Sequence, residues 1–175
     1  MKAYEFTLKF SLQNETDNPA QYIEKLGAAG CDDALTGIGQ HGRIALNIIR
    51  ESTSAYEAIV SAIADVKKAI PGAKLVEATP DIVGLTDVAD LLGCTRQNMR
   101  KLMINSGSAF PQPFHEGKPA IWHLANILLW LKENRNYQIE DTLIDIAIAN
   151  MQFNLVKELN NIEPAVQEDI RALIA

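Results

Sequence analysis

The chain of 175 residues predicts an α+β fold made of three consecutive parts. Within residues 1–80, strand and helix patterns follow one another in the order strand, helix, strand, strand, helix, strand. Residues 81–137 contain two short helical patterns joined by a tight turn, and residues 138–175 carry two further helical patterns. We therefore expect a sheet-and-helix domain, a small helical module with a β-hairpin, and a helical tail.

The opening strand shows the clearest periodicity in the first part. Apolar and polar residues alternate over residues 4–13, which is the period of a strand with one buried face. A helical pattern follows over residues 19–29, where proline suits the first turn and a glycine ends the helix. Two more strands are predicted at 33–39 and 43–50, joined by a turn at 40–42.

A second helix begins near Ser54, which is spaced from Glu57 as in a capping box. Its apolar stripe runs to Ile70, after which Pro71 and glycine stop the helix, and residues 74–78 form the last strand. This order is that of a ferredoxin-like βαββαβ sandwich, two helices on one face of a four-stranded antiparallel sheet. It resembles the ligand-binding and oligomerisation modules of bacterial regulators, so protein docking, dimerisation and ligand sensing all stay open.

Residues 85–103 carry the pattern most indicative of function. A first apolar stripe ends at Gly93, which can take the left-handed conformation that turns the chain. Thr95 can then cap a second helix whose buried stripe contains Met99 and Leu102. The cations and amides left outward on this helix are Arg96, Gln97, Asn98, Arg100 and Lys101. Such side chains hydrogen-bond base edges and phosphates, so the pattern predicts a helix-turn-helix.

The following residues extend this unit. Pro111 and Pro113 favour extended backbone, and residues 114–122 predict a small hairpin with Gly117 in its turn. A helix is then predicted over residues 123–133, with leucine and isoleucine on its buried face. The aromatic residues expected in this core are Phe110, Phe114 and Trp122.

Residues 85–134 resemble the winged helix-turn-helix of MerR-like and AlpA-like bacterial and phage regulators. The resemblance rests on Leu85-Thr86-Asp87-Val88-Ala89, Leu92-Gly93-Cys94-Thr95-Arg96-Gln97, Phe110-Pro111-x-Pro113, and Trp122 followed by the helix from Leu124 to Leu131. In that family the second helix enters the major groove and the hairpin wing reaches the backbone or the minor groove. The resemblance implies that the recognition helix contributes Thr95, Arg96, Gln97, Asn98, Arg100 and Lys101, and the wing His115 and Lys118.

Each of these residues also has a simpler interpretation. The first-turn position of Arg96 and Gln97 favours base contact over plain solvation. For Arg100 and Lys101, phosphate contact and solubility stay open, and His115 could instead pack against the hairpin's tryptophan. Metal sensing by thiolates is not implied, because no cysteine follows Cys94.

The net charge of −6 is distributed unevenly along the chain. Residues 1–80 hold 8 basic and 10 acidic side chains, and residues 138–175 hold 2 basic and 7 acidic ones. Residues 81–137 hold 6 basic and 5 acidic side chains and form the only net-positive part. This bias permits DNA binding, but electrostatic attraction contributes little to the affinity of one copy. We therefore expect two copies to bind the DNA together.

The tail predicts a helix from about Ile139 with an unusually wide apolar surface, followed by a second helix from Pro164. Such a surface must be buried, which favours a role in oligomerisation, with packing inside the chain as the alternative. The chain has no glycine-rich phosphate loop, no Cys-x-x-Cys and no His/Glu cluster at metal-ligand spacing. We therefore expect no enzyme activity, no cofactor and no bound metal.

These patterns favour a sequence-specific DNA-binding transcriptional regulator that acts as a homodimer or higher homo-oligomer on double-stranded DNA. One alternative is an antitoxin or adaptor that holds a protein partner and binds DNA for autoregulation, and a second is a small-ligand sensor. Cys31 and Cys94 are expected to be free thiols, and no apolar run approaches the roughly 20 residues that span a bilayer. We expect a cytoplasmic protein without a membrane partner.

Overall fold

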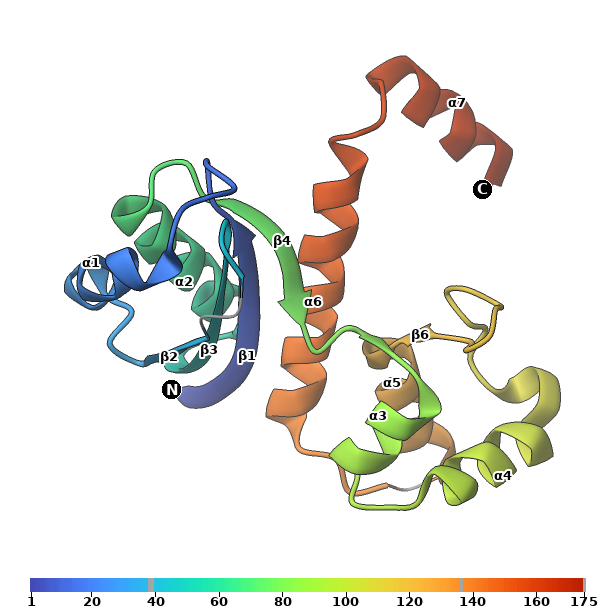
Figure 1. Ribbon diagram of the computed structural model, residues 1–175. Coiled ribbons are helices and arrows are strands. Elements are labelled where there is room, and N and C mark those ends of the chain that lie inside the picture. Colours follow the sequence, from blue (N-terminus) through green and yellow to red (C-terminus); the bar gives the residue numbers. More distant parts are fainter. Residues whose placement is uncertain (38–39, 136, 175) are drawn as a thin grey trace.

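A long helix, α6 (Asp141–Leu159), lies between the two halves of the molecule in the computed structural model (Figure 1). One half is a sheet covered by helices, and the other is a cluster of short helices with a two-residue strand pair. The structure describes residues 1–37, 40–135 and 137–174. Across these ranges, no helix combines the length and apolar character needed to cross a membrane.

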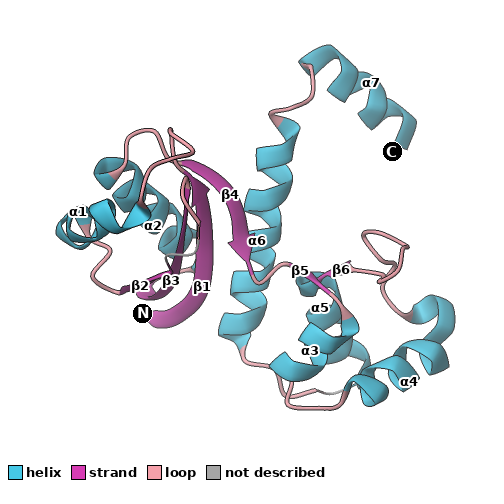
Figure 2. Cartoon of the chain, in the orientation of Figure 1, coloured by secondary structure: helices cyan, strands magenta, loops and turns pink. Residues whose placement is uncertain are grey.

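The sheet of the first half has the strand order β2-β3-β1-β4, and all neighbouring strands are antiparallel (Figure 2). Its strands are β1 (Lys2–Ser11), β2 (Ala34–Gly37), β3 (Arg43–Ser52) and β4 (Lys74–Thr79). The central pair runs from Lys2 opposite Ser52 to Ser11 opposite Arg43. The predicted strand 33–39 is shorter, and its last two residues, 38 and 39, lie outside the described residues.

Two helices, α1 (Ile23–Ala29) and α2 (Ala55–Ala69), cover one face of this sheet. The alternation predicted for β1 holds, because the side chains buried beneath the helices are Tyr4, Phe6, Leu8 and Phe10. The predicted helix over residues 19–29 is divided in two: a 3-10 turn, η1 (Pro19–Tyr22), precedes α1, and the Asn18 side chain caps that turn by accepting from the Ala20 N–H. Ser54 Oγ accepts from the Glu57 N–H at 3.1 Å, as a helix cap should.

The second half contains the predicted pair of short helices. Its elements are β5 (Ile82–Val83), α3 (Leu85–Leu91), α4 (Arg96–Ser106), a 3-10 turn η2 (Gly107–Ala109), β6 (Trp122–His123) and α5 (Leu124–Arg135). The core residues supplied by these elements, together with Phe110 directly after η2, are Val83, Val88, Ala89, Met99, Trp122, Leu124, Ala125, Ile127, Leu128 and Leu131. Helix α5 begins one residue later and ends two residues later than predicted.

The predicted β-hairpin of residues 114–122 is largely absent. Only His115 and Ile121 form an antiparallel bridge, with N···O distances of 3.3 and 3.1 Å. Trp122 instead belongs to β6, which pairs with β5 and so ties the start of this half to the start of α5. The predicted hairpin is thus reduced to one bridge, because Trp122 and His123 find their hydrogen-bond partners about forty residues upstream.

Helix α6 contributes to both hydrophobic cores. Ile146 and Ala149 join the core beneath the sheet, whereas Ile144 and Ala147 join the core of the second half. Packing inside the chain, the alternative left open by the sequence, therefore accounts for the first half of this helix. The last helix, α7 (Pro164–Ile174), has no buried residue, and an oligomerisation role stays a prediction there.

A row of polar side chains on α6 follows the edge of β4. Asn154 donates from Nδ2 to the Ala78 carbonyl at 2.8 Å and accepts from the Ala78 N–H at 2.9 Å. The Asn154 amide also donates to the buried Asp81 carboxylate at 2.8 Å, and that carboxylate lies 2.7 Å from Nδ1 of His123. This network joins the sheet, α6 and β6, and so holds the two halves of the molecule together.

Candidate nucleic-acid interface

The turn between α3 and α4 fixes the direction of α4. Gly93 has φ +63°, in the left-handed region that favours glycine, and the following Cys94 N–H donates to the Ala89 carbonyl at 2.9 Å. Thr95 then begins the next helix, and its Oγ1 accepts from the Asn98 N–H at 3.2 Å. The local signals seen in the sequence therefore form the turn and cap that they predicted.

Helix α4 buries one side and exposes the other. Met99 is fully buried, and Leu102 and Met103 are half-buried against the core. The predicted binding residues Thr95, Arg96, Gln97, Asn98, Arg100 and Lys101 are all exposed. None of the three cations among them forms a salt bridge with any residue in the described ranges. This surface is therefore available for hydrogen bonds with an anionic ligand.

A groove of about 1120 Å³ separates α4 from the loop of residues 107–121. Arg96 and Arg100 line it from the helix, and Lys118 lines it from the loop. Two carboxylates, from Asp87 and Glu116, line the same groove and reduce its positive potential. The structure thus brings three of the predicted cations to one place, in a setting of mixed charge.

The other predicted binding residues of α4 do not line this groove. Gln97 and Lys101 are four residues apart and therefore share one exposed face of the helix. Asn98 is spaced by four residues from Leu102, so it lies toward the half-buried side of α4. The row predicted from the sequence is therefore divided among three neighbouring faces.

Two exposed apolar side chains were missed by the sequence reasoning. Ile104 is 61% exposed and lines the groove, four residues after Arg100. Phe114, expected in the core, is 58% exposed, and its ring centroid lies 4.8 Å from that of His123 in an edge-on arrangement. Helical spacing from Arg100 could have identified Ile104 as a groove residue, whereas the exposure of Phe114 depends on the reduced hairpin and had no local signal.

The residues predicted to form a wing are solvent-accessible but are held by little regular structure. His115 and Lys118 are both exposed, and the His115 ring lies close to Gly117. The Nε1–H of the neighbouring Trp122 donates to the Pro111 carbonyl at 3.0 Å. Both side chains could therefore reach a ligand beside the groove.

The cysteines form no metal site. Cys31 is buried, Cys94 is half-buried, and both thiols are free. Burial, followed by the negative charge of Asp65, raises the pKa of the Cys31 thiol to about 11. No cluster of three or more His, Cys, Asp or Glu side chains suited to a metal ion occurs in the described parts of the chain.

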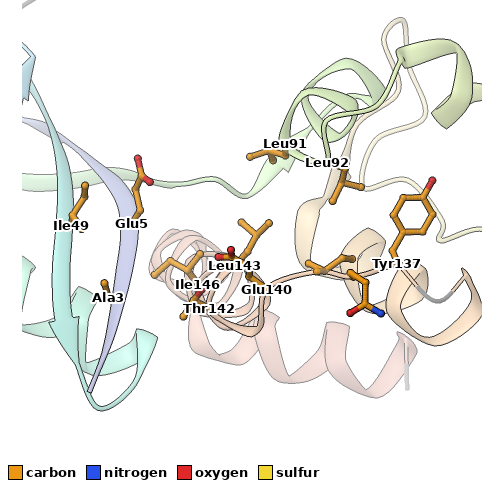
Figure 3. Close-up of a pocket in the computed structure, with 12 residues that line it drawn as sticks. Ala3, Glu5, Ile49, Leu91, Leu92, Tyr137, Glu140, Thr142, Leu143 and Ile146 are labelled. Atoms are coloured by element: carbon orange, nitrogen blue, oxygen red, sulfur yellow. The ribbon is translucent and has the colours of Figure 1, made fainter.

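A separate cleft of about 520 Å³ lies between the open face of the sheet and the second half (Figure 3). Its walls come from β1 and β3, from the end of α3 and from the start of α6. The apolar lining residues are Ala3, Ile49, Leu91, Leu92, Ile139, Leu143 and Ile146. Glu5 and Glu140 add two carboxylates, and Tyr137 adds a phenol.

Comparison of the chain with protein families, curated proteins and solved structures gave no significant match. Function is therefore inferred from the placement and chemistry of the residues described above.

Proposed function

We propose that the protein is a sequence-specific DNA-binding transcriptional regulator that acts as a homodimer. In this proposal residues 85–134 form a winged helix-turn-helix, and residues 1–80 form a ferredoxin-like domain that positions it. The observation that carries the proposal is the exposed face of α4, with cations that have no salt-bridge partner in the described chain and amides on a well-capped helix. Arginine and amide side chains on such a helix can bond both base edges and phosphates.

The positions of the two arginines on α4 support different contacts with DNA. Arg96 occupies the first turn of α4, and helices of this kind read bases mainly from their N-terminal residues. Arg96 and Arg100 share one face with the groove, while Gln97 and Lys101 share the next face. We assign base contact to Arg96 and Gln97, with Asn98 at the edge of the contact, and phosphate contact to Arg100 and Lys101.

Thr95 and the loop residues complete the proposed contact surface. The Thr95 Oγ1 atom already accepts a hydrogen bond from the backbone, so its hydroxyl proton is available to a phosphate oxygen. His115 and Lys118 lie on the loop across the groove from α4 and would contact the DNA backbone. Because only one bridge orders this loop, we expect these contacts to add affinity more than sequence specificity.

The modest charge of this surface explains why the proposal includes two copies. Residues 81–137 carry a net charge of only +1, and Asp87 and Glu116 lie within the groove. Nucleic-acid affinity depends strongly on the number of phosphates neutralised. A homodimer doubles that number and reads two half-sites about one helical turn, roughly 34 Å, apart.

Selection of bound sequences from a random pool of duplex DNA tests this function. We expect the purified wild-type chain to enrich a two-fold symmetric motif. The matched control is the Arg96→Ala, Gln97→Ala double variant, which removes exposed side chains only and should enrich no motif. Equal enrichment by the variant, or no enrichment by the wild type, would contradict the proposal.

A ligand-sensing role is the second candidate, and the cleft in Figure 3 favours it. Its volume of about 520 Å³ falls within the range of roughly 300–1,000 Å³ typical of small-molecule sites. The apolar walls and the carboxylates of Glu5 and Glu140 favour an apolar amine. A thermal-shift screen of such amines should raise the Tm of the wild type and leave the Glu5→Gln, Glu140→Gln variant unchanged.

A further inference from the structure

The apolar stripe of α6 extends beyond the core that it serves. Ile144, Ile148 and Met151 pack against the second half of the molecule. Leu155 and Leu159 continue the same three-to-four-residue spacing, yet they are 43% and 36% exposed. The upper half of the stripe therefore has the composition of a helix-packing surface without a helix on it in the described chain.

Helix α7 has the complementary property. Its apolar residues Val166, Ile170, Leu173 and Ile174 follow helical spacing and are 44%, 41%, 84% and 78% exposed. No residue of α7 from 164 to 174 is buried, and Figure 1 shows the helix leaving the top of α6 at an angle and standing apart from both halves. An amphipathic helix with an open apolar face favours association with another apolar surface.

We propose that these two surfaces bind each other between two copies of the chain. The inference rests on the proposed function, in which the protein is a homodimer, and it assigns the interface. Helix α7 of one copy packs on the stripe formed by Leu155, Leu159 and the adjoining Ile162 of the second copy, and the contact is repeated by a two-fold axis. Each copy thus provides both α7, here called the arm, and the stripe that receives the partner's α7, here called the seat. Isologous interfaces require such a reciprocal contact.

Continuity with the packing inside each chain favours a helix as the occupant of the stripe. Helix α5 already packs on the lower part of α6, where Leu128 and Leu131 belong to the same core as Ile144. The stripe above it has the same residue types and spacing, so a second helix can pack in the same manner. The amphipathic helix that the chain itself leaves uncovered is α7.

The extent of the surface favours a second copy of the chain. Seven side chains contribute to it: Leu155, Leu159, Ile162, Val166, Ile170, Leu173 and Ile174. Because each copy uses both its own α7 and its own stripe, all seven become covered on each partner. Stable interfaces cover about 800 Å² per partner, and an arm alone would supply only part of that area.

This arrangement would also set the geometry of DNA reading. Helix α6 belongs to both cores, so a contact at its upper end is transmitted rigidly to α4 of the same copy. The two-fold axis through the α6–α7 contacts would then determine the distance between the two recognition helices.

Disulfide trapping between two different variants tests the interface. Leu155→Cys is made in one chain, and Ile170→Cys is made in a second chain that carries a tag of different length. Cys94→Ser is included in both chains. Mixed under mild oxidation, they should give a disulfide-linked heterodimer. The matched control replaces the Ile170→Cys chain by Leu35→Cys, an exposed leucine on the far edge of the sheet, and should give no such product.

Light scattering gives the second readout. The wild type and Leu35→Asp should have the mass of a dimer, and Ile170→Asp that of a monomer. We expect the dimer to persist at high salt because its contacts are apolar, whereas DNA binding weakens.

A monomeric wild type, or a dimer without the mixed disulfide, would overturn the assigned interface, including the case in which a different protein covers α7. A dimer that traps as predicted but enriches no DNA motif would refute the proposed function alone.

Discussion

Two exposed cations on α4 differ in their surroundings, and this difference predicts different effects on DNA binding. Arg96 lines the groove in the first turn, whereas Lys101 lies on the outer face. Arg96→Ala should weaken binding to a selected site by about 1–3 kcal/mol, roughly 5- to 150-fold, and binding to random DNA much less. Lys101→Ala should weaken binding to both DNAs alike. It should also lower the slope of log affinity against log salt concentration by about one, the change expected for one lost phosphate contact.

Fluorescence anisotropy with labelled selected and random duplexes, over a series of salt concentrations, measures both effects. Lys74→Ala is the matched control, because this exposed lysine lies on β4, in the other half of the molecule. Losses that are the same for Arg96→Ala and Lys101→Ala on both duplexes would contradict the assigned roles.

The two cysteines should differ in reactivity. Burial raises the pKa of Cys31 to about 11, and the charge of Asp65 acts in the same direction. At pH 8 only about one Cys31 in a thousand is then a thiolate, so iodoacetamide should modify the half-buried Cys94 first. Mass spectrometry of the alkylated native chain measures this order, and faster modification of Cys31 would contradict it.

The same shift has a consequence for stability. The folded-state pKa of Cys31 lies above the ordinary value of 9.0, so the unfolded chain loses the thiol proton at lower pH than the folded chain. The contribution of this thiol to the free energy of unfolding is therefore fully present below pH 9 and falls as the pH rises toward 11. In Cys31→Ala this part of the pH dependence should be absent.

At the scale of the elements, α6 takes the place of a strand at the edge of β4. An edge strand leaves backbone groups unpaired, and Asn154 pairs with both the N–H and the carbonyl of Ala78 as a neighbouring strand would. The Lys157 ammonium donates to the Val76 carbonyl, and Asn150 donates to the Pro80 carbonyl at 3.1 Å. The edge of the sheet is thereby protected from pairing with another chain.

Asn154→Leu should therefore destabilise the protein by about 3 kcal/mol, because it leaves the buried Ala78 amide and the Asp81 carboxylate without this partner. Urea unfolding measures the loss, and hydrogen exchange of the Ala78 amide should become faster. The control Asn161→Leu changes an exposed asparagine beyond the end of α6 and should stay within about 0.5 kcal/mol. Equal stability of the two variants would contradict a role of Asn154 at the sheet edge.

Local signals predicted most of the elements, and pairing over long distances accounts for most errors. The alternation in β1 and the caps at Ser54 and Thr95 depend on neighbouring residues, and the structure contains all three. The two-residue strands β5 and β6 are too short to show a period, so the sequence could not reveal that they pair. Because the sequence did not reveal this pairing, Phe114 was expected in the core, and the groove beside α4 was not anticipated.

At the scale of the whole molecule, α6 makes the two halves mutually dependent. Its opposite sides supply Ile146 to the core of the sheet and Ile144 to the core of the second half. The wide apolar surface was evident in the sequence, but a surface of this kind can be covered from inside or outside the chain. Whether the same chain or another chain buries this surface depends on where distant segments of the chain fold. Periodicity carries no information about the positions of those segments.

This sharing predicts that the two halves unfold together. Both tryptophans, Trp122 and Trp130, lie in the second half, so their fluorescence reports on that half, while circular dichroism reports on the whole chain. Leu46→Ala removes a fully buried side chain beneath the sheet and should cost about 2–5 kcal/mol. If α6 couples the cores, the midpoint of urea unfolding followed by tryptophan fluorescence should fall as far as the midpoint followed by circular dichroism. Leu35→Ala, at an exposed position of the same sheet, should change neither midpoint. A fluorescence midpoint unmoved by Leu46→Ala would instead show that the two cores unfold independently despite the helix that they share.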